Sequence, residues 1–263
     1  MPLYTADALV LRTYALGESD RIVVFLTDDR GKKRGVARGA RRPRSRFAGA
    51  LEPLTQVRVA YFEKERRELV GLNYAEPVRS PLAARPEAMA HIGYFAELID
   101  EWAQDGDPSE RLYRLGASLL EALSAGGAVE PLARYLEFWI LRLQGVYPPF
   151  RLCHRCGAPL AAGAWLAPGA QVFTCGGCAP AAIAQLGPNL SLRALGVLHE
   201  MRRLPPLAVG GLTLDPAAAT ELERVHHILM GRHLERELKS TRVLRELRRP
   251  ASERSPRQAE SNR

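Results

Sequence analysis

The sequence predicts an α+β protein in which a small closed β-barrel comes first and an α-helical domain, interrupted by a cysteine-bearing insertion, follows. Three observations carry this prediction. They are closely spaced apolar segments in the first 80 residues, helical periodicity beyond Pro81, and two CxxC pairs within the helical part. Of the 263 residues, 46% are hydrophobic and 25% charged, as in ordinary folded proteins. No apolar run approaches the ~20 residues that a membrane span needs, so we expect no membrane association.

The first 80 residues contain five candidate strands and no helical stretch. Each candidate is rich in β-branched or apolar residues and is bounded by turn residues. The candidates are 8–13, 21–27, 34–39, 54–62 and 69–74. Five such strands suit a five-stranded barrel of the OB type, which we assign to residues 1–80. The third strand leads into a Gly- and Arg-rich loop, 39–49, that is too polar for a core.

Helical periodicity begins after Pro81. Apolar residues repeat every three or four positions in three segments, 90–102, 112–123 and 132–143. Two further helical stretches are predicted, from Leu192 to Leu204 and from Pro216 to about Leu247. Residues 81–150 and 181–248 are therefore assigned to one α-helical domain. Residues 249–263 contain almost nothing apolar and are predicted to be a disordered tail.

Ionisable residues on the predicted helices receive structural interpretations. Glu97, Asp100 and Glu101 are expected on a helix surface from their spacing. His226 and His227 are expected on a helix surface or in packing.

The strongest motif is a pair of CxxC sequences separated by 18 residues, Cys153–Cys156 and Cys175–Cys178. This spacing is a zinc signature, and four thiolates fill a tetrahedral Zn²⁺ shell. We therefore predict one structural zinc in a four-cysteine zinc finger over residues 151–180. The alternatives are two redox CxxC motifs or four buried free thiols. His154, inside the first pair, is expected to be a bystander because the cysteines complete the ligand set.

Charge is unevenly distributed along the chain, whose net charge is +8. Residues 30–51 hold nine basic and no acidic residues, 85–145 have a net charge of −5, and 232–263 have a net charge of +5. Clustered Lys and Arg suit the backbone of a nucleic acid, although such a run is also typical of a solvated face. The candidate DNA-binding residues are Lys32, Lys33, Arg34, Arg38, Arg41, Arg42, Arg44 and Arg46. Neighbouring aromatics are sparse; Phe47 suits an anchor for the loop, and Tyr61 and Phe62 suit the core.

Enzyme motifs are missing from the sequence. There is no P-loop, no G-x-S-x-G and no H-E-x-x-H, and no residues are arranged as a nucleophile and its base. A zinc hydrolase is disfavoured because four thiolates leave no coordination position for water. We expect a protein without catalytic activity. One alternative is a zinc-containing RNA-binding factor that assists transcription or translation.

Several segments resemble one bacterial family. The resemblance lies in the stretches Ala8–Arg12, Gly17–Val23, Ala37–Phe47 and Leu51–Pro53, in the Gly145–Pro149 turn directly before the cysteine pairs, and in His233–Leu234 with Leu238–Ser240. Together these segments look like RecO, a family of recombination mediators. The resemblance covers residues 1 to about 247. It implies an OB domain followed by a helical domain with an inserted zinc finger, in agreement with the patterns above.

The resemblance also implies a function in DNA repair and homologous recombination. Family members bind single- and double-stranded DNA, anneal complementary strands, act with RecR to load RecA, and contact the single-strand DNA-binding protein through its acidic tail. Arg134 and Arg142, on the helix that carries Trp139, are our candidates for contacting such a tail. Because no export signal precedes Asp7, we expect a cytoplasmic, nucleoid-associated protein.

Overall fold

Five strands close into a barrel in the first third of the chain, as the sequence predicts. They are β1 (Leu3–Leu16), β2 (Asp20–Thr27), β3 (Lys32–Ala37), β4 (Gln56–Phe62) and β5 (Leu69–Arg79). Their order is β1-β2-β3-β5-β4, and β1 pairs with β4 to close the ring. Only β3 and β5 are parallel. The computed structural model describes residues 2–63, 68–81, 88–167, 169, 171–234 and 238–248, so the predicted tail over 249–263 lies outside the described residues.

Strands β1 and β2 are buried on both faces. Ala8 and Val10 point into the barrel, whereas Leu9 and Leu11 belong to the core of the helical part. This explains the unbroken apolar run of β1, because a strand covered on both sides needs no polar alternation. Helix α2 (Glu110–Ser124) lies so close to β1 that a Cβ atom at Gly116 would be 2.6 Å from Leu9 Cδ1. The barrel and the helices therefore share a continuous apolar contact.

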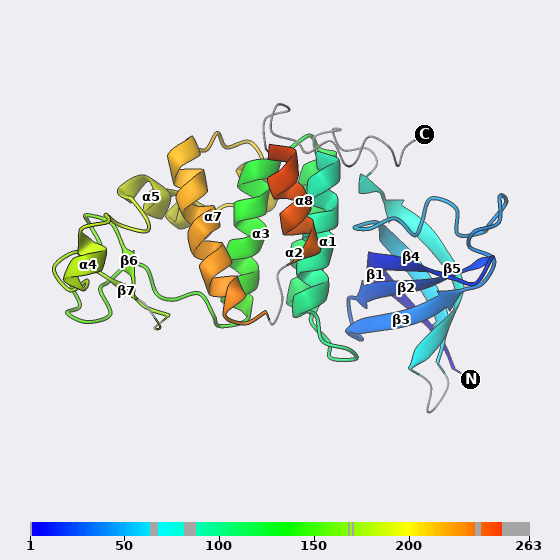
Figure 1. Ribbon diagram of the computed structural model, residues 1–263. Helices are drawn as coiled ribbons and strands as arrows, with labels where there is room; N and C mark the ends of the chain where they lie inside the picture. The colour runs from blue at the N-terminus through cyan, green and yellow to red at the C-terminus, as the bar shows by residue number, and fades with distance from the viewer. Residues whose placement is uncertain are drawn as a thin grey trace.

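The helices form the middle of the molecule, with the barrel at one end and the cysteine segment at the other (Figure 1). The long helices besides α2 are α1 (Met89–Trp102), α3 (Val129–Leu143), α5 (Leu192–Met201), α7 (Pro216–Gly231) and α8 (Lys239–Arg248). Short helices α4 (Ala181–Ala184) and α6 (Pro206–Val209) and the two-stranded sheet of β6 (Trp165–Leu166) and β7 (Phe173–Thr174) complete the fold. Among the helices of the described residues, none has the length and apolar character that a bilayer crossing requires.

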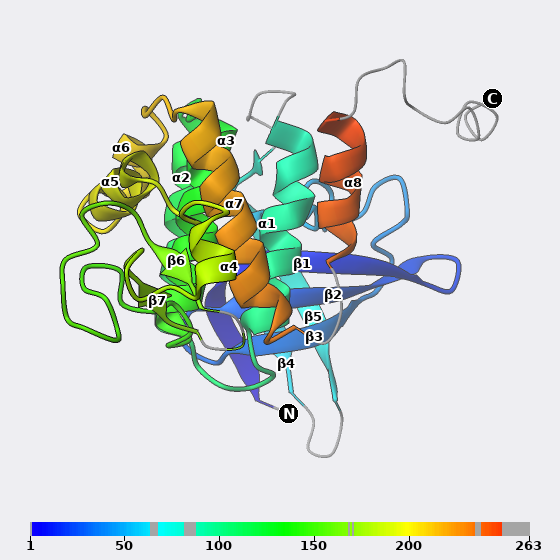
Figure 2. The same ribbon diagram turned by 60° about the vertical axis from the view of Figure 1, so that its left-hand side comes forward.

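The prediction of one helical stretch from Pro216 to about Leu247 is wrong. Helix α7 ends at Gly231, and α8 begins at Lys239 and packs beside α1 (Figure 2). Gly231 is the last residue of α7, and its low helix propensity is the local signal that the periodicity concealed. The separate α8 is joined to α1 through Glu97, whose carboxylate accepts hydrogen bonds from the backbone N–H groups of Lys239 and Ser240 at 3.2 and 2.7 Å.

A group of ionisable side chains lies inside the helical core. Glu137 of α3 is fully buried; it accepts a hydrogen bond from the Tyr94 hydroxyl at 2.7 Å and pairs with His226 Nδ1 at 2.9 Å. Arg134, one turn earlier, places Nη2 3.0 Å from the same carboxylate. These contacts join α1, α3 and α7 through one charge. His226 therefore serves in packing, one of the two alternatives that the sequence left open.

Candidate nucleic-acid interface and metal centre

The loop between β3 and β4 is ordered although it is rich in glycine and arginine. It runs through successive turns in which the N–H groups of Arg42, Ser45, Ala48 and Ala50 each donate to a carbonyl three residues earlier. Phe47, Ala50 and Leu51 are buried and belong to the barrel core. Phe47 is therefore an anchor, as the sequence predicts, and the residues between the anchors are held at the surface.

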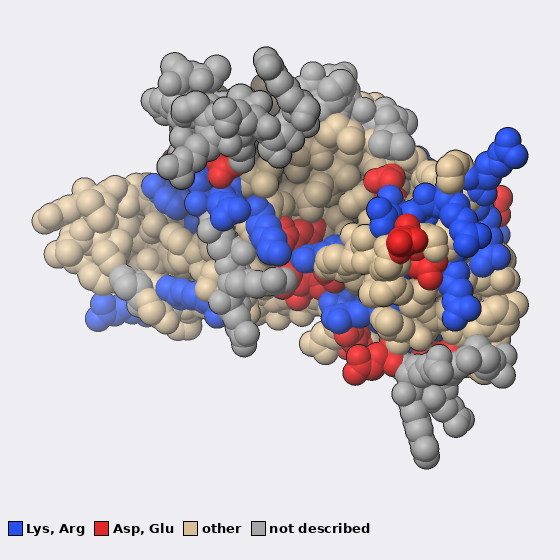
Figure 3. Space-filling model, turned by 45° about the vertical axis from the view of Figure 1, so that its right-hand side comes forward, with Lys and Arg blue, Asp and Glu red and all other residues tan. Residues whose placement is uncertain are grey.

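The arginines of this loop face solvent. The exposed residues are Arg38, Arg41, Arg42, Arg44 and Arg46. Arg41 donates from Nη1 to the Gly17 carbonyl at 2.9 Å, which ties the loop to the β1–β2 turn, and the Arg46 guanidinium lies 5.1 Å from the centre of the Phe47 ring. Basic side chains gather over the barrel half of the molecule in Figure 3. Such a ridge of positive charge on an ordered loop attracts polyanions.

Lys32 and Lys33 do not belong to that ridge, which corrects their assignment as phosphate contacts. Lys32 Nζ donates to the Asp100 carbonyl at 2.8 Å, and its side chain is 11% exposed. Lys33 Nζ donates to Glu63 at 2.9 Å, and its side chain is 18% exposed. Arg34 is more open, at 54%, and lies 3.4 Å from the Asp105 carboxylate. Strand β3 therefore directs its basic side chains to protein carboxylates.

Glu97 and Asp100 are not surface residues, which corrects another expectation. Both are buried, and they face the barrel together with Glu101. The spacing of residues along the sequence places Glu97 and Asp100 opposite the apolar stripe of α1. That spacing contains no information about the strand of the barrel that covers these carboxylates. These three carboxylates thus contribute to the junction between the barrel and the helices, whereas Asp105, Asp107, Glu110 and Glu121 of the acidic segment are exposed.

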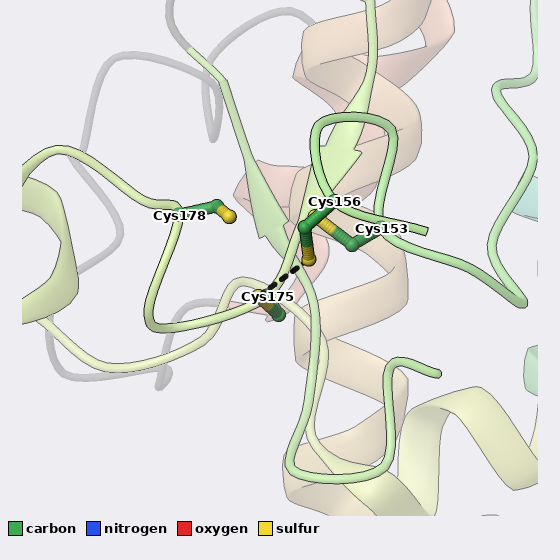
Figure 4. Close-up of side chains that lie close together, drawn as sticks. All are labelled: Cys153, Cys156, Cys175 and Cys178. Atoms are coloured by element: carbon green, nitrogen blue, oxygen red, sulfur yellow. Dashed lines mark hydrogen bonds between the residues drawn. The ribbon is translucent and has the colours of Figure 1, made fainter. Parts of the chain in front are cut away.

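The four cysteines meet in one cluster at the far end of the molecule (Figure 4). Their Sγ atoms all lie within 4.8 Å of one another, and Cys156 Sγ is 3.7 Å from Cys175 Sγ. Four sulfurs at ~2.3 Å from a tetrahedral ion would be about 3.8 Å apart. The donor set and its geometry therefore fit one metal ion.

A local turn shapes each CxxC pair, and a backbone hydrogen bond links the first turn to the strand that leads into the second pair. The N–H of Gly157 donates to the Cys153 carbonyl at 2.9 Å, and that of Cys178 donates to the Cys175 carbonyl at 3.0 Å. Gly157 has a φ of +73°, which favours glycine after the first pair. The His154 backbone N–H donates to the Phe173 carbonyl at 2.9 Å and so links the first turn to β7.

The turns also prepare a thiolate. Burial raises the pKa of the Cys153 thiol, but backbone hydrogen bonds from Cys175, Cys156 and Arg155 outweigh it and bring the pKa to about 6. A thiolate is the form that binds metal. Hydrogen bonds with Cys156 and Cys175 raise the pKa of the Cys178 thiol to about 12, and a bound cation would favour its thiolate, so the cluster suits a metal ion better than four separate thiols.

The two candidate partner-binding arginines are not equivalent. Arg134 is wrong as a surface contact, because its side chain is only 2% exposed and lies against Glu137. Arg142 is exposed at the end of α3, with its guanidinium 5.8 Å from the ring centres of both Phe138 and Trp139. Sequence reasoning missed the role of Glu137. Its position three residues before Ile140, on the predicted apolar stripe of this helix, is the sequence signal that could have found it.

The closed five-stranded barrel, the arginine-rich surface loop, the helical body and the four-cysteine cluster define a barrel protein with a surface suited to polyanions and a site that could hold one metal ion. The sequence matches two family profiles, "Recombination protein O N terminal" over residues 1–81 and "Recombination protein O C terminal" over residues 84–242. The chain therefore belongs to the RecO family of DNA repair proteins.

Individual relatives agree along almost the whole chain. The DNA repair protein RecO of Koribacter versatilis is 35% identical over 248 residues, which cover 93% of this chain and 99% of the relative. That of Anaeromyxobacter sp. strain K is 37% identical over 91% of this chain and 94% of the relative. The DNA repair protein RecO of Geobacter sulfurreducens is 35% identical over 92% of this chain and 97% of the relative. The similarity thus includes both the barrel and the helical region.

Proposed function

We propose that this protein is a recombination mediator that binds single- and double-stranded DNA without sequence preference and anneals complementary strands without catalysing a reaction. With RecR, it helps to load RecA onto strands coated by the single-strand DNA-binding protein. The observation that carries the proposal is the ordered arginine ridge on the barrel (Arg38, Arg41, Arg42, Arg44 and Arg46), in a chain of the RecO family. The ridge offers clustered positive charge on an exposed surface, which suits contact with phosphates.

Annealing requires that two polyanions approach each other. The ridge supplies one basic surface, and the positive segment 232–263 supplies charge for a second. In the part of that segment that the structure describes, Arg232, Lys239 and Arg242 are exposed. Repulsion between strands acts over about 8–10 Å at moderate salt, so bound arginines and lysines would offset it at short range. The rate should therefore fall as salt rises.

The metal site has a structural function in this proposal. We infer that the ion is one Zn²⁺ held by Cys153, Cys156, Cys175 and Cys178, because a four-thiolate shell is typical of structural zinc. Such a shell has no open position for water, which supports a protein that is not a zinc hydrolase. The ion would fasten the segment 151–180 to the helical body.

The helical body would serve the protein partners. Arg142 beside Trp139 offers a cation next to an apolar ring, which suits an acidic tail that ends in hydrophobic residues. The parts of this proposal that concern RecR and coated strands rest on the resemblance to the family. A mediator of bacterial recombination would work in the cytoplasm at the nucleoid.

The test is a fluorescence annealing assay with complementary DNA oligonucleotides, with and without ATP, on bare strands and on strands coated by the single-strand DNA-binding protein. We expect faster annealing than in the uncatalysed reaction, with no effect of ATP. A matching RNA pair separates this function from that of an RNA-binding accessory factor. Annealing at the uncatalysed rate, dependence on ATP, or a preference for RNA would contradict the proposal. Failure on coated strands alone would remove only the part that concerns the single-strand DNA-binding protein.

A further inference from the structure

An open groove of about 680 Å³ lies on the outward face of the barrel, over β3 and β5. Val36 of β3, Phe62 at the end of β4, and Leu69 and Gly71 of β5 line it, and Arg38 and Arg46 of the arginine ridge lie at its border. The groove is therefore continuous with the surface that we propose to contact phosphates. Its own lining is largely apolar, which phosphate binding does not explain.

Gly71 lies at the centre of the groove. The strand register places it opposite Val36 on one side and opposite Phe62 on the other. It is exposed, and among the residues that the structure describes a Cβ atom added there would meet no atom within 4 Å. Gly35, on the inner face of the neighbouring strand, is the opposite case, because its Cβ would lie 2.0 Å from Leu72 Cδ1.

Neither packing nor backbone conformation demands a glycine at position 71. It is absent from the glycines with positive φ, and the space above it is open. A glycine inside a strand destabilises it relative to alanine, and it often marks a place where a ligand approaches the backbone closely. The glycine therefore leaves bare backbone as the floor of the groove between two apolar side chains, and twice the interstrand spacing of ~4.8 Å puts the two flanking strands about 10 Å apart, which leaves room for a planar ring.

The charges around the groove indicate which planar ring fits. Arg38 and Arg46 are exposed, and Arg46 is steadied over Phe47. The acidic residue among those that line the groove is Glu68. The next residue, Leu69, is paired with Arg34 of β3. The parallel register puts Glu68 five positions before the level of Arg38, or ~16 Å along the strands. A ligand with an anionic backbone at the arginine end and a planar apolar face on the floor satisfies both features.

We propose that this groove is a base-binding subsite for single-stranded DNA, in which a base lies on Gly71 against Phe62 while the adjoining phosphates contact Arg38 and Arg46. The subsite rests on the proposed DNA-binding function and deepens it. A duplex satisfies the arginines but keeps its bases stacked inside, so only a single strand uses the groove. Because every base has a planar face, the subsite does not depend on sequence.

The experiment compares two strands with the same number of phosphates: an oligo-dT strand and a strand of the same length made entirely of abasic sites. Fluorescence anisotropy gives the affinity of the full-length protein for each at matched salt. Stacking contributes about 1–3 kcal/mol per base, so the native protein should bind oligo-dT about 5- to 150-fold more tightly than the abasic strand.

Two substitutions remove the subsite by different routes. Gly71→Leu fills the floor and Phe62→Leu removes the aromatic face; each should bring the ratio of affinities close to one while leaving the affinity for the abasic strand and its salt dependence unchanged. Val78→Leu is the matched control, because Val78 lies on the same strand, is 59% exposed and does not line the groove. Circular dichroism establishes that each variant is folded. If Gly71→Leu does not fold, Phe62→Leu still tests the subsite.

The outcomes separate this inference from the proposed function. Equal binding of both strands by the native protein would overturn the subsite and leave the arginine contacts intact. An equal loss for both strands in the folded Gly71→Leu protein would also overturn it, since the groove would then act on the backbone. Binding of neither strand would overturn the proposed DNA-binding function itself.

Discussion

Arg12 of β1 donates a hydrogen bond of 2.9 Å from Nη2 to Oε1 of Glu101 on α1, and thereby ties the barrel to the helical body. Its Nε lies 2.5 Å from the Asp100 carboxylate, to which Lys32 of β3 is also paired. Glu97, 3.5 Å from Arg12, completes the group and reaches α8 on its other side. One cluster of charges therefore joins the barrel, α1 and α8. The arginine ridge is consequently held in a fixed position relative to the helices.

Glu97→Ala should loosen α8. The Glu97 carboxylate caps the first backbone N–H groups of this helix and also accepts from the Ser240 hydroxyl at 2.5 Å. Loss of a cap of this kind costs about 1–2 kcal/mol. Hydrogen exchange should accelerate over residues 239–242 in this variant. Glu101→Ala is the control, because Glu101 contacts Arg12 at the barrel side; equal acceleration of α8 in both variants would contradict the capping role.

Stability should fall as the pH drops below about 6.5, partly through His226. Burial lowers the pKa of His226, so the folded protein keeps the imidazole neutral while the unfolded chain takes up a proton. The stabilisation by the neutral imidazole is present at neutral pH and is lost on acidification. The free energy of unfolding then falls by at most about 1.4 kcal/mol per pH unit. Urea unfolding of His226→Gln should show a flatter pH dependence between about pH 7 and 5. An unchanged slope in His226→Gln would refute this origin.

A second acidic transition should follow at lower pH through Glu137. Burial alone would raise the pKa of Glu137, but Arg134 and His226 outweigh it and lower the pKa to about 2. Its stabilising charge is fully present above about pH 4.5 and is lost as the pH falls toward 2. Glu137→Gln leaves Arg134 without its closest carboxylate and should destabilise by about 3–5 kcal/mol at neutral pH. Glu130→Gln, 3.7 Å from the same arginine but 39% exposed, should cost less than about 1 kcal/mol. Equal losses in the two variants, measured by urea unfolding, would mean that burial does not decide the effect.

Purified protein should carry about one Zn²⁺ per chain. Metal analysis after purification under reducing, chelator-free conditions measures this directly. Cys175→Ser should reduce the zinc content and expose residues 150–180 to proteolysis, because structural zinc supplies roughly 10–16 kcal/mol in isolated fingers. His154→Ala should retain the ion, since four cysteines complete the shell. Protein without zinc under these conditions would contradict the assignment.

Replacing Arg41, Arg42, Arg44 and Arg46 with alanine should weaken DNA binding about equally for all sequences. For every phosphate that the variant no longer neutralises, the log–log salt slope should fall by about 0.7 on single strands and 0.9 on duplex. Lys33→Ala is the matched control, because Lys33 is already paired with Glu63, and its slope should remain native. An unchanged slope in the quadruple variant would identify the ridge as a solvated face. Weaker binding of one particular sequence alone would contradict phosphate recognition.

The sequence determined the features that depend on local signals. The closely spaced apolar segments predict the barrel, and the strands extend further than predicted where β1 pairs with two neighbours. The CxxC spacing predicts the metal cluster, because each pair forms its own turn and needs only the other pair to complete the shell. The polar composition of residues 39–49 predicts a surface loop and Phe47 its anchor, and Phe47 is buried.

Only the tertiary structure decided which charged residues face solvent. Lys32 and Arg46 belong to the same basic run, yet one is paired with Asp100 and the other lies beside an open groove. Arg134 and Arg142 share one helix, yet one is buried against Glu137 and the other is exposed. The physical reason is that an ionisable side chain is compensated by whatever carboxylate the fold brings to it from a distant segment. Periodicity along one helix or strand specifies a face, whereas the partner on that face comes from another element.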